Sequence, residues 1–315
     1  MDDEVVVVGA GVSGLTTAVV LAESGVPTRV LTDRPTRETT SMVAGALWGP
    51  SFQPPFDKTL EWTAQSLDDF QRLATDPTTG VRIANVLTVG DALPDGDLPP
   101  QVTMISGLRA ATSDELPPGF AAGSWGRMPV VDMPTYLGHL ERRLAAAGVH
   151  IDHTRVTDLA DAGERVVNCT GLGARDLAGD DTLRPVFGQH VILTNPGLDD
   201  AFMELGRDAE WTSFMPHPER VVCGGIRIPD RYDLTPDDDL TARILERCRR
   251  VEPRLRDATV IETVTGLRPD RPSVRVTVEW RDDRTLIVHN YGHSGTGVSL
   301  SWGCARESAR LITGS

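Results

Sequence analysis

The stretch VVVVGAGVSGL, from Val5 to Leu15, decides the fold of this 315-residue chain. The apolar run that ends at Val8 predicts a strand over residues 4–8, buried on both faces of a parallel sheet. A helix is expected from about Leu15 to Ser24, because Gly25 stands where a helix C-terminal glycine belongs. Residues 28–32 predict a second strand, so the segment reads as a βαβ unit.

Three glycines in this unit, Gly9, Gly11 and Gly14, have the spacing GxGxxG. The first suits a tight turn, the second lets the backbone approach a pyrophosphate, and the third permits close packing of helix and strand. Asp33 stands 24 residues after Gly9, near the position of a ribose-binding carboxylate. The unit therefore predicts a dinucleotide site and by itself leaves NAD and FAD both open.

Two later stretches favour FAD. VVNCTGLGAR, from Val166 to Arg175, predicts a buried strand that ends in small residues, a turn that FAD-containing folds place near the adenosine. HNYGHSGTGVSLSWGCA, from His289 to Ala305, is a second glycine-rich passage from strand to helix. The positive end of its helix, expected to begin near Val298, would stabilise negative charge on a reduced flavin ring. One glycine loop would then hold the pyrophosphate and the other the ring.

The composition excludes several classes of protein. A net charge of -14 argues against nucleic-acid binding, which requires clustered Lys and Arg. The four cysteines are far apart and the seven histidines form no metal-binding pair, so neither a disulfide framework nor a metal is expected. No membrane span and no secretory signal are expected, and the chain is predicted to be cytoplasmic. At ~150 residues per domain, the chain length of 315 residues suggests about two domains.

Hydrophobic periodicity predicts the remaining elements. Apolar residues at intervals of three and four predict helices over 56–70, 133–144 and 240–251. Strands are expected around 149–153, 165–168, 260–264 and 274–278, and the region 186–228 is β-rich.

Six ordered motifs resemble the D-amino-acid oxidase family along most of the chain: VVVVGAGVSGLTTA, TTSMVAGALWGP, VVNCTG, CGGI, TGLRPDRPSVR and HNYGHSGTGVSLSWGCA. The resemblance implies an α/β fold. A Rossmann-like FAD-binding domain of the glutathione-reductase type would be interleaved with a substrate domain built on a large mixed or antiparallel sheet. We expect residues 1–50, 130–180 and 281–315 in the FAD-binding domain and residues 51–129 and 181–280 in the substrate domain.

The same resemblance implies the activity and its reagents. It implies non-covalent FAD and the oxidative deamination of D-amino acids, by hydride transfer from the substrate Cα to flavin N5. The products would be a 2-oxo acid, ammonia and hydrogen peroxide, with O2 as the oxidant. A homodimer is a possible assembly.

Carried over residue by residue, the resemblance assigns the cofactor site. The glycine loop and a threonine-rich run would hold the diphosphate, the next group the adenosine, and the rest the flavin ring. These residues are Gly9, Ala10, Gly11, Val12, Ser13, Gly14, Asp33, Arg34, Thr39, Thr40, Ser41, Ala46, Leu47, Val156, Cys169, Thr170, Gly171, Arg268, His293, Ser294, Gly295, Gly297, Val298 and Ser299.

For the substrate, the resemblance points to Arg268 as the bidentate partner of the carboxylate and to the Gly295 carbonyl as an acceptor from the amino group. No residue is expected to act as an acid or a base, and His293 is expected to have a backbone or packing role. Ser213 stands where the family usually has a carboxylate-binding tyrosine, and a second, lid tyrosine is missing. Trp211 is expected to form part of the pocket wall.

Three alternatives remain open at the level of sequence. The first is an oxidase of glycine, sarcosine or another secondary amine on the same fold. The second is a preference for acidic D-amino acids, using a further basic side chain such as Arg227 or His217. The third, which Arg268 and the YGHSGTG loop disfavour, is a flavin-binding protein without turnover.

Overall fold

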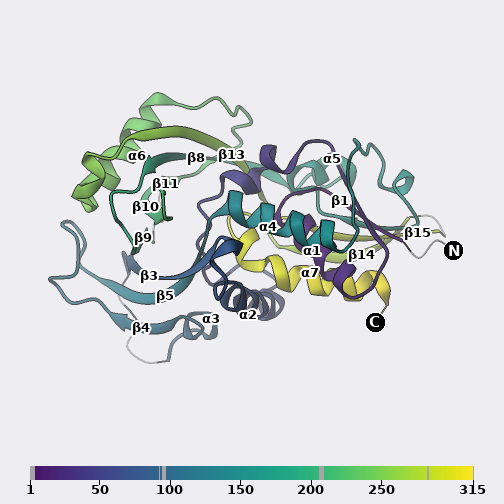
Figure 1. Cartoon of the computed structure of the whole chain (residues 1–315), viewed down its shortest axis with the longest axis horizontal. Helices are drawn as coiled ribbons and strands as arrows, with labels where there is room; N and C mark the ends of the chain where they lie inside the picture. Colours follow the sequence, from purple (N-terminus) through teal and green to yellow (C-terminus); the bar gives the residue numbers. More distant parts are fainter. Residues whose placement is uncertain (1–3, 92, 94–96, 206–208, 282–283, 315) are drawn as a thin grey trace.

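The computed structural model describes residues 4–91, 93, 97–205, 209–281 and 284–314, arranged around two β-sheets. One sheet and most of the helices form one half of the elongated molecule, and the other sheet forms the opposite half (Figure 1). The described chain begins and ends in this first half.

The first sheet has six strands in the order β14-β15-β7-β1-β2-β6. They are β14 (Arg275–Arg281), β15 (Thr285–Tyr291), β7 (Arg165–Asn168), β1 (Val5–Val8), β2 (Thr28–Thr32) and β6 (Ile151–His153). All neighbours are parallel except β14, which runs antiparallel to β15. Every residue of β1 is buried, as expected for a central strand covered on both faces.

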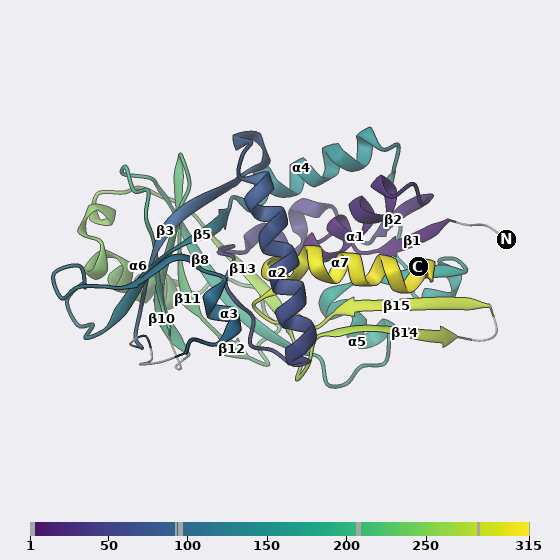
Figure 2. The same ribbon diagram turned by 90° about the horizontal axis from the view of Figure 1, so that it is seen from below.

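Four long helices belong to this half of the molecule: α1 (Val12–Glu23), α2 (Phe56–Leu73), α4 (Met133–Ala146) and α7 (Gly297–Thr313). Figure 2 shows α2 crossing over α7. The two helices approach so closely at Gly303 that a Cβ atom there would lie 2.3 Å from the Cα of Trp62. Helix α1, which the sequence predicts from about Leu15, begins earlier, at Val12, directly after the second glycine of the turn.

The second sheet has nine strands, mostly antiparallel. They are β3 (Val81–Val89), β4 (Ser106–Ala110), β5 (Gly123–Val131), β8 (Arg184–Thr194), β9 (Ala201–Glu204), β10 (Glu210–Pro216), β11 (Arg220–Ile226), β12 (Ile228–Pro229) and β13 (Val260–Asp270). β8 pairs with β11, β12 and β13. Helix α6 (Asp238–Val251) packs Leu240, Ile244 and Cys248 into the core of this half. The fold class predicted from the sequence is confirmed.

Short segments connect these elements. They are α3 (Pro100–Thr103), α5 (Ala174–Leu177) and the 3-10 turns η1 (Thr36–Glu38), η2 (Thr40–Val43), η3 (Pro77–Thr79), η4 (Leu159–Asp161), η5 (Gly171–Gly173) and η6 (Pro253–Arg256).

The predicted division into domains differs from the division by sheets at two places. β14 belongs to the first sheet, whereas residues 181–280 were assigned to the substrate domain. Helix α2, also assigned there, packs on α7 of the other half. The interleaved domain boundaries stay a prediction.

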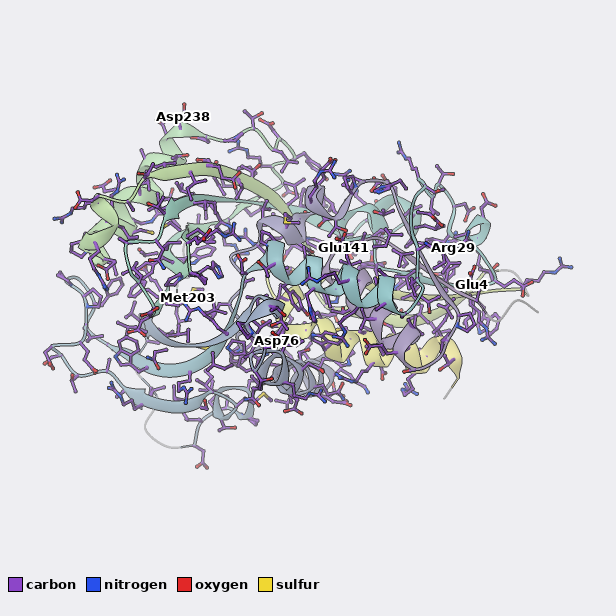
Figure 3. The ribbon with its side chains drawn as sticks, in the orientation of Figure 1. Glu4, Arg29, Asp76, Glu141, Met203 and Asp238 are labelled. Carbon is purple, nitrogen blue, oxygen red and sulfur yellow. The ribbon has the colours of Figure 1, made fainter. Side chains whose placement is uncertain are left out.

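Charged side chains lie at both ends of the molecule (Figure 3). At one end Arg29 of β2 and Glu4 form a half-buried ion pair of 3.4 Å. At the other end Asp238 lies in the first turn of α6. No helix within the described ranges combines the length and apolar character that a membrane span requires.

Candidate cofactor and substrate site

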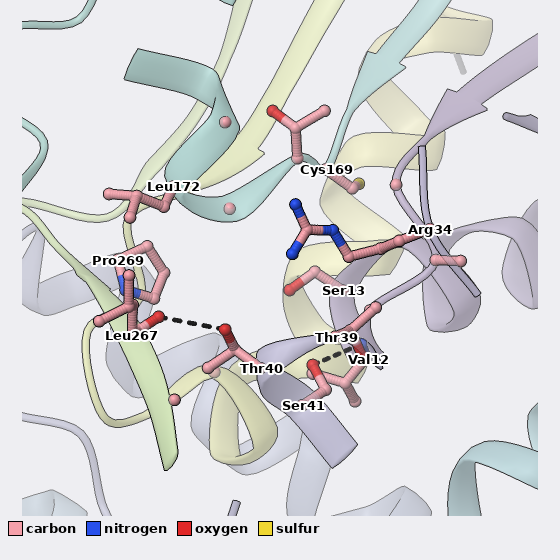
Figure 4. A pocket seen from close by; sticks show the side chains of 18 of the residues that line it. Val12, Ser13, Arg34, Thr39, Thr40, Ser41, Cys169, Leu172, Leu267 and Pro269 are labelled. Carbon is pink, nitrogen blue, oxygen red and sulfur yellow. Dashed lines mark hydrogen bonds between the residues drawn. The ribbon is translucent and has the colours of Figure 1, made fainter. Parts of the chain in front are cut away.

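A cavity of about 1000 Å³ extends from the carboxyl ends of the central parallel strands to β8 and β13 of the second sheet. In an open α/β sheet, ligands bind at these strand ends. Figure 4 shows one part of the cavity, where Arg34, Ser13, Cys169, Leu172 and Thr40 surround the open space.

The first glycine turn forms one wall of this cavity. Gly9 has a φ of +113°, and a Cβ atom on it would lie 2.5 Å from the carbonyl oxygen of Cys169. Gly11 lines the cavity, and a Cβ there would lie 3.1 Å from Ser41 Oγ. Gly9 therefore depends on the absence of a side chain, whereas Gly11 leaves only limited space for one.

Gly14 does not line the cavity. A Cβ on it would lie 1.8 Å from the carbonyl oxygen of Gly9, so this glycine lets α1 pack against the end of β1. Its geometry matches the packing role of the third glycine, not contact with a ligand.

The positive end of α1 faces the cavity. Gly11 caps the helix without a side-chain hydrogen bond, and the first turn contains no acidic residue. The Val12 N–H donates to Ser41 Oγ at 2.9 Å, which brings the threonine-rich segment beside the glycine turn (Figure 4). Such a helix end suits a phosphate group.

The ends of β2 and β7, the strands on either side of β1, and the segment after β6 continue the wall beside the glycine turn. Asp33 and Arg34 line the cavity and form an exposed pair at 3.4 Å. Val156, Cys169 and Thr170 also line this part of the cavity. Burial raises the pKa of the Cys169 thiol to about 12, so this cysteine is protonated and unreactive at neutral pH.

The second glycine turn lies farther along the cavity, before α7. Thr296 caps α7 without a side-chain hydrogen bond, so this helix end is also free to face a ligand. His293 lines the cavity, is 4% exposed, and its Nε2 atom has no partner within the described chain. Burial lowers the pKa of His293 to about 4, so the ring is neutral.

A hydrogen-bond network fixes this turn. Gln53 Nε2 donates to Ser294 Oγ at 2.8 Å, and Thr296 Oγ1 donates to Gln53 Oε1 at 2.7 Å. Ser294 Oγ donates to Asp270 Oδ1 at 2.5 Å, and the Ser294 N–H donates to the Pro269 carbonyl at 3.1 Å. The turn is thereby tied to β13.

Arg268 of β13 supplies an unneutralised positive charge. Its Nη1 donates to the carbonyl of Ile226 at 3.1 Å, and its guanidinium lies over Gly188, where a Cβ would be only 2.5 Å from Nη1. No acidic side chain of the described residues forms an ion pair with it. Burial, with a smaller effect of the positive charge of Arg227, lowers the pKa of Arg268 to about 10, so it remains charged at neutral pH.

His190 of β8 also lines the cavity, and the sequence did not identify it. Its Nδ1 lies 2.8 Å from the Val43 carbonyl. Burial, together with the charge of Arg268, lowers the pKa of His190 to about 4. One feature of the sequence could have identified His190: it is a polar residue two positions after Gly188, so the two residues face the same side of the strand.

The cavity brings together most of the predicted cofactor residues. These are Gly9, Ala10, Gly11, Val12, Ser13, Asp33, Arg34, Thr39, Thr40, Ser41, Val156, Cys169, Thr170, Gly171, Arg268, His293, Ser294, Gly295, Gly297 and Val298. Among the lining residues that the sequence did not identify are Arg37, Thr154, Arg155, Leu172, Tyr232 and Leu234.

Three predicted flavin contacts do not line the cavity. Ala46 and Leu47 connect instead to β5, because the Ala46 carbonyl accepts from the Val131 N–H and Leu47 forms a bridge with Val130. Ser299 is 4% exposed, and its Oγ accepts from the Gly49 N–H at 3.1 Å.

The two predicted substrate residues on β10, Ser213 and Trp211, do not line it either. Ser213 is 4% exposed and pairs with Gly224 of β11. The Trp211 carbonyl lies against Gly225, where a Cβ would be 1.7 Å away. Neither of the two candidate basic residues lines the cavity. Arg227 is exposed and close to Arg268, whereas His217 is buried near Asp132 and Arg220. No group of three potential metal ligands occurs among the residues that the structure describes.

Comparison with known proteins shows similarity to FAD-dependent oxidoreductases along nearly the whole chain. The family model of FAD dependent oxidoreductases matches residues 4–311. A D-amino-acid oxidase of Streptomyces coelicolor is 44% identical over 99% of this chain and 97% of its own length. Human D-aspartate oxidase is 33% identical over 98% of this chain and 94% of its own length. Glycine oxidase of Geobacillus kaustophilus has a similar structure, with a TM-score of 0.80 over 99% of this chain and 94% of its own, but is only 18% identical.

Proposed function

This chain belongs to the D-amino-acid oxidase family of FAD-dependent oxidoreductases, and from that membership we propose that it catalyses the oxidative deamination of D-amino acids. The observation that carries the proposal is Arg268, a partly buried guanidinium in the cavity with no acidic partner in the described chain. A buried charge without a partner is costly, and a substrate carboxylate would supply that partner.

The residues of the cavity fit FAD, held without a covalent bond. The unpartnered Nε2 of His293 is a buried polar atom that a ligand can satisfy. The turn leaves no room for a side chain at Gly9 and little at Gly11, and the helix ends of α1 and α7 both face the cavity. Together they suit a long ligand with a pyrophosphate at one end and an electron-accepting ring at the other.

FAD, when bound, supplies the acceptor for the hydride of the substrate. The chain itself contributes orientation: Arg268 holds the carboxylate through two parallel hydrogen bonds, and the Gly295 carbonyl accepts from the amino group. Two fixed contacts on neighbouring groups limit the rotation of the substrate Cα, and such positioning can account for most of the rate gain. Both His190 and His293 are neutral at pH 7, because burial lowers their pKa to about 4, and we assign neither of them a proton-transfer step.

The overall reaction that we propose consumes one D-amino acid, O2 and water, and releases a 2-oxo acid, ammonia and hydrogen peroxide. The direct test is to follow the flavin absorbance without oxygen while D- and L-amino acids, glycine and sarcosine are added. We expect bleaching by D-amino acids. Bleaching by glycine or sarcosine alone would replace the proposal with an amine oxidase, and a flavin that no amine reduces would remove it.

A preference for acidic side chains is a second candidate, and the proximity of Arg227 to Arg268 favours it. Arg227 is exposed near the substrate carboxylate partner, so it could pair with a second carboxylate. We expect Arg227→Gln to lower kcat/KM for D-aspartate by about twofold to fivefold more than for D-alanine, the range of an exposed ion pair. An unchanged ratio of the two constants would reject this role.

We also propose that the enzyme works in the cytoplasm and without a metal. The four cysteines are buried and free, as expected where thiols stay reduced. Cell fractionation tests the location, and activity that survives a chelator tests the independence from metal. A homodimer, the assembly that we propose, is tested by light scattering of the purified protein.

A further inference from the structure

The guanidinium of Arg268, a hydrogen-bond donor that reaches over from β13, and the ring of His190, a hydrogen-bond acceptor, lie on the same face of β8. The Arg268 guanidinium lies over Gly188, and His190 follows two residues later, so its side chain projects from the same face. Two residues along a strand span roughly 6.6 Å, which is within the reach of hydrogen bonds to the two ends of one amino acid. Both residues line the cavity.

The proton of the His190 ring is on Nδ1. That atom lies 2.8 Å from the Val43 carbonyl oxygen, which can only accept, so Nδ1 must donate. The ring is neutral, because burial and the nearby charge of Arg268 lower its pKa to about 4. Nε2 therefore carries a lone pair and can only accept a hydrogen bond.

Two glycines hold the ring in place. A Cβ atom on Gly224 would lie 2.3 Å from His190 Cδ2, and one on Gly45 would lie 3.5 Å from His190 Nε2. The ring thus fills the space that these glycines leave open. No hydrogen-bond partner of Nε2 occurs in the described part of the chain.

The charged group that faces His190 is Arg268 of β13, with Arg227 beyond it. From η2 the ring meets the Val43 carbonyl, and the Gly45 backbone lies close to the ring, since a Cβ there would be 3.4 Å from His190 Cε1. No carboxylate among the described residues approaches the ring closely enough to raise its pKa. The site therefore offers a cation for a carboxylate and, beside it, a neutral acceptor for an N–H group.

We propose that His190 contacts the substrate directly, with Nε2 accepting a hydrogen bond from the amino group while Arg268 binds the carboxylate. This inference rests on the proposed function and deepens it. Gly295, also beside Arg268, would provide a second acceptor, since a Cβ on it would be 3.8 Å from Arg268 Cδ. His190 would thus favour amino acids over carboxylates of the same shape that lack an N–H.

The probes are 2-aminoisobutyrate and trimethylacetate, which differ by one amino group in place of one methyl group. Neither has a hydrogen on Cα, so neither can be oxidised, and both report only binding. Their dissociation constants would be measured with the FAD-loaded enzyme from the change in flavin absorbance. Wild-type protein should bind 2-aminoisobutyrate at least about tenfold more tightly.

Two variants separate the two ring nitrogens. His190→Asn keeps a donor for the Val43 carbonyl and removes the acceptor at Nε2, whereas His190→Gln keeps an acceptor near Nε2 and removes the donor. We expect His190→Asn to weaken 2-aminoisobutyrate binding about tenfold and to change trimethylacetate binding less than about twofold. His190→Gln should keep most of the preference. His150→Asn, at an exposed histidine, is the matched control.

A second approach does not alter the histidine. Gly224→Ala would displace the ring through the contact at Cδ2 and should cause the same selective loss. Equal weakening of both probes, or an unchanged preference in His190→Asn, would overturn the role of His190. D-alanine that fails to bleach the wild-type flavin would instead reject the proposed function, so the two failures are distinguishable.

Discussion

Arg268 carries a positive charge that no acidic side chain of the described residues neutralises. Its Nη1 donates to the backbone carbonyls of Ile226 at 3.1 Å and Phe187 at 3.5 Å, and Nε and Nη2 have no hydrogen-bond partner among the described residues. The guanidinium lies against Gly188 of β8, where a side chain would occupy the same space as Nη1. At the scale of the residue, the positive charge of Arg268 can bind a substrate carboxylate because Gly188 has no side chain that would displace the guanidinium.

Replacing Arg268 should therefore affect substrate binding more than folding. We expect Arg268→Ala to lower kcat/KM for D-amino acids by about 30-fold to 1000-fold, mainly through KM, because truncating one partner of a buried charge pair costs roughly 2–4 kcal/mol. Steady-state kinetics measure the effect. The kcat/KM of Arg268→Lys should lie between those of the wild type and Arg268→Ala, since lysine keeps the positive charge but cannot form two parallel hydrogen bonds to a carboxylate. Unchanged kinetics would contradict the assignment of the carboxylate partner.

Gly14 offers a prediction about packing. We expect Gly14→Ala to destabilise the glycine turn and to weaken FAD binding at least tenfold, because its Cβ would overlap the Gly9 carbonyl and α1 would have to move away from β1. Fluorescence titration with FAD measures this. Gly49→Ala is the control, since nothing lies within 4 Å of the added atom. Equal affinities in both variants would reject the explanation.

At the scale of the element, the turn between β15 and α7 is held from three directions. Gln53 links Ser294 and Thr296, and Asp270 at the end of β13 accepts from Ser294. Next to it, the Asp180 carboxylate accepts from Arg271 Nε at 2.8 Å and from the Tyr291 hydroxyl at 2.9 Å. These contacts fix the turn relative to the strand that carries Arg268.

Removing the bridge at Gln53 should loosen the turn. We expect Gln53→Ala to weaken FAD binding about tenfold, the effect of losing two hydrogen bonds to a partly buried loop, with little change in thermal stability. The measurement is the FAD dissociation constant. Asn85→Ala, which removes an exposed hydrogen bond to Asp200 on the second sheet, is the control and should leave the constant unchanged.

Asp180 predicts a dependence of stability on pH. Burial alone would raise the pKa of this carboxyl, but hydrogen bonds from Thr182, Arg271 and Tyr291 outweigh it and hold the pKa well below its usual value. A lowered folded-state pKa means that the stabilisation is fully present above the unfolded pKa of about 4 and is lost as the pH falls below it. Asp180→Asn should therefore cost about 1–3 kcal/mol at pH 7.

Chemical denaturation of the wild type and the variant at several pH values measures this effect. The difference between their free energies of unfolding should shrink as the pH falls from about 4 toward 2. A difference that stays constant over that range would show that the loss comes from packing and not from the ionised carboxylate.

At the scale of the whole molecule, the cavity joins the two halves. Its walls come from the first sheet, from η2 and from β8 and β13 of the second sheet. A ligand that occupies this space contacts both halves, so its binding free energy should add to the stability of the folded protein.

FAD should accordingly raise the melting temperature. With free FAD at about 100 times its dissociation constant, the stabilisation is about 2.7 kcal/mol, or about 4 °C for a chain of this length. Differential scanning fluorimetry of FAD-depleted protein, with and without added FAD, measures the shift. A melting temperature that does not respond to FAD would contradict a site shared by both halves.

The sequence by itself determined the local parts of this protein. The apolar run of β1, the glycines after it and the end of β2 are consecutive, so their periodicity and backbone requirements were sufficient to predict the βαβ unit and the dinucleotide site. Long amphipathic helices were also predicted correctly, because side-chain spacing reports directly on one buried face.

Only the tertiary structure decided which residues meet across the cavity. His190 lies on β8, Val43 on η2 and Gly224 on β11, and no local pattern relates them. The same limit explains Ser213, Ala46 and Leu47, which strand pairing directs away from the cavity although their motifs lie near it. Periodicity specifies which face of an element is buried, whereas the neighbours of that face depend on packing between segments far apart in the chain.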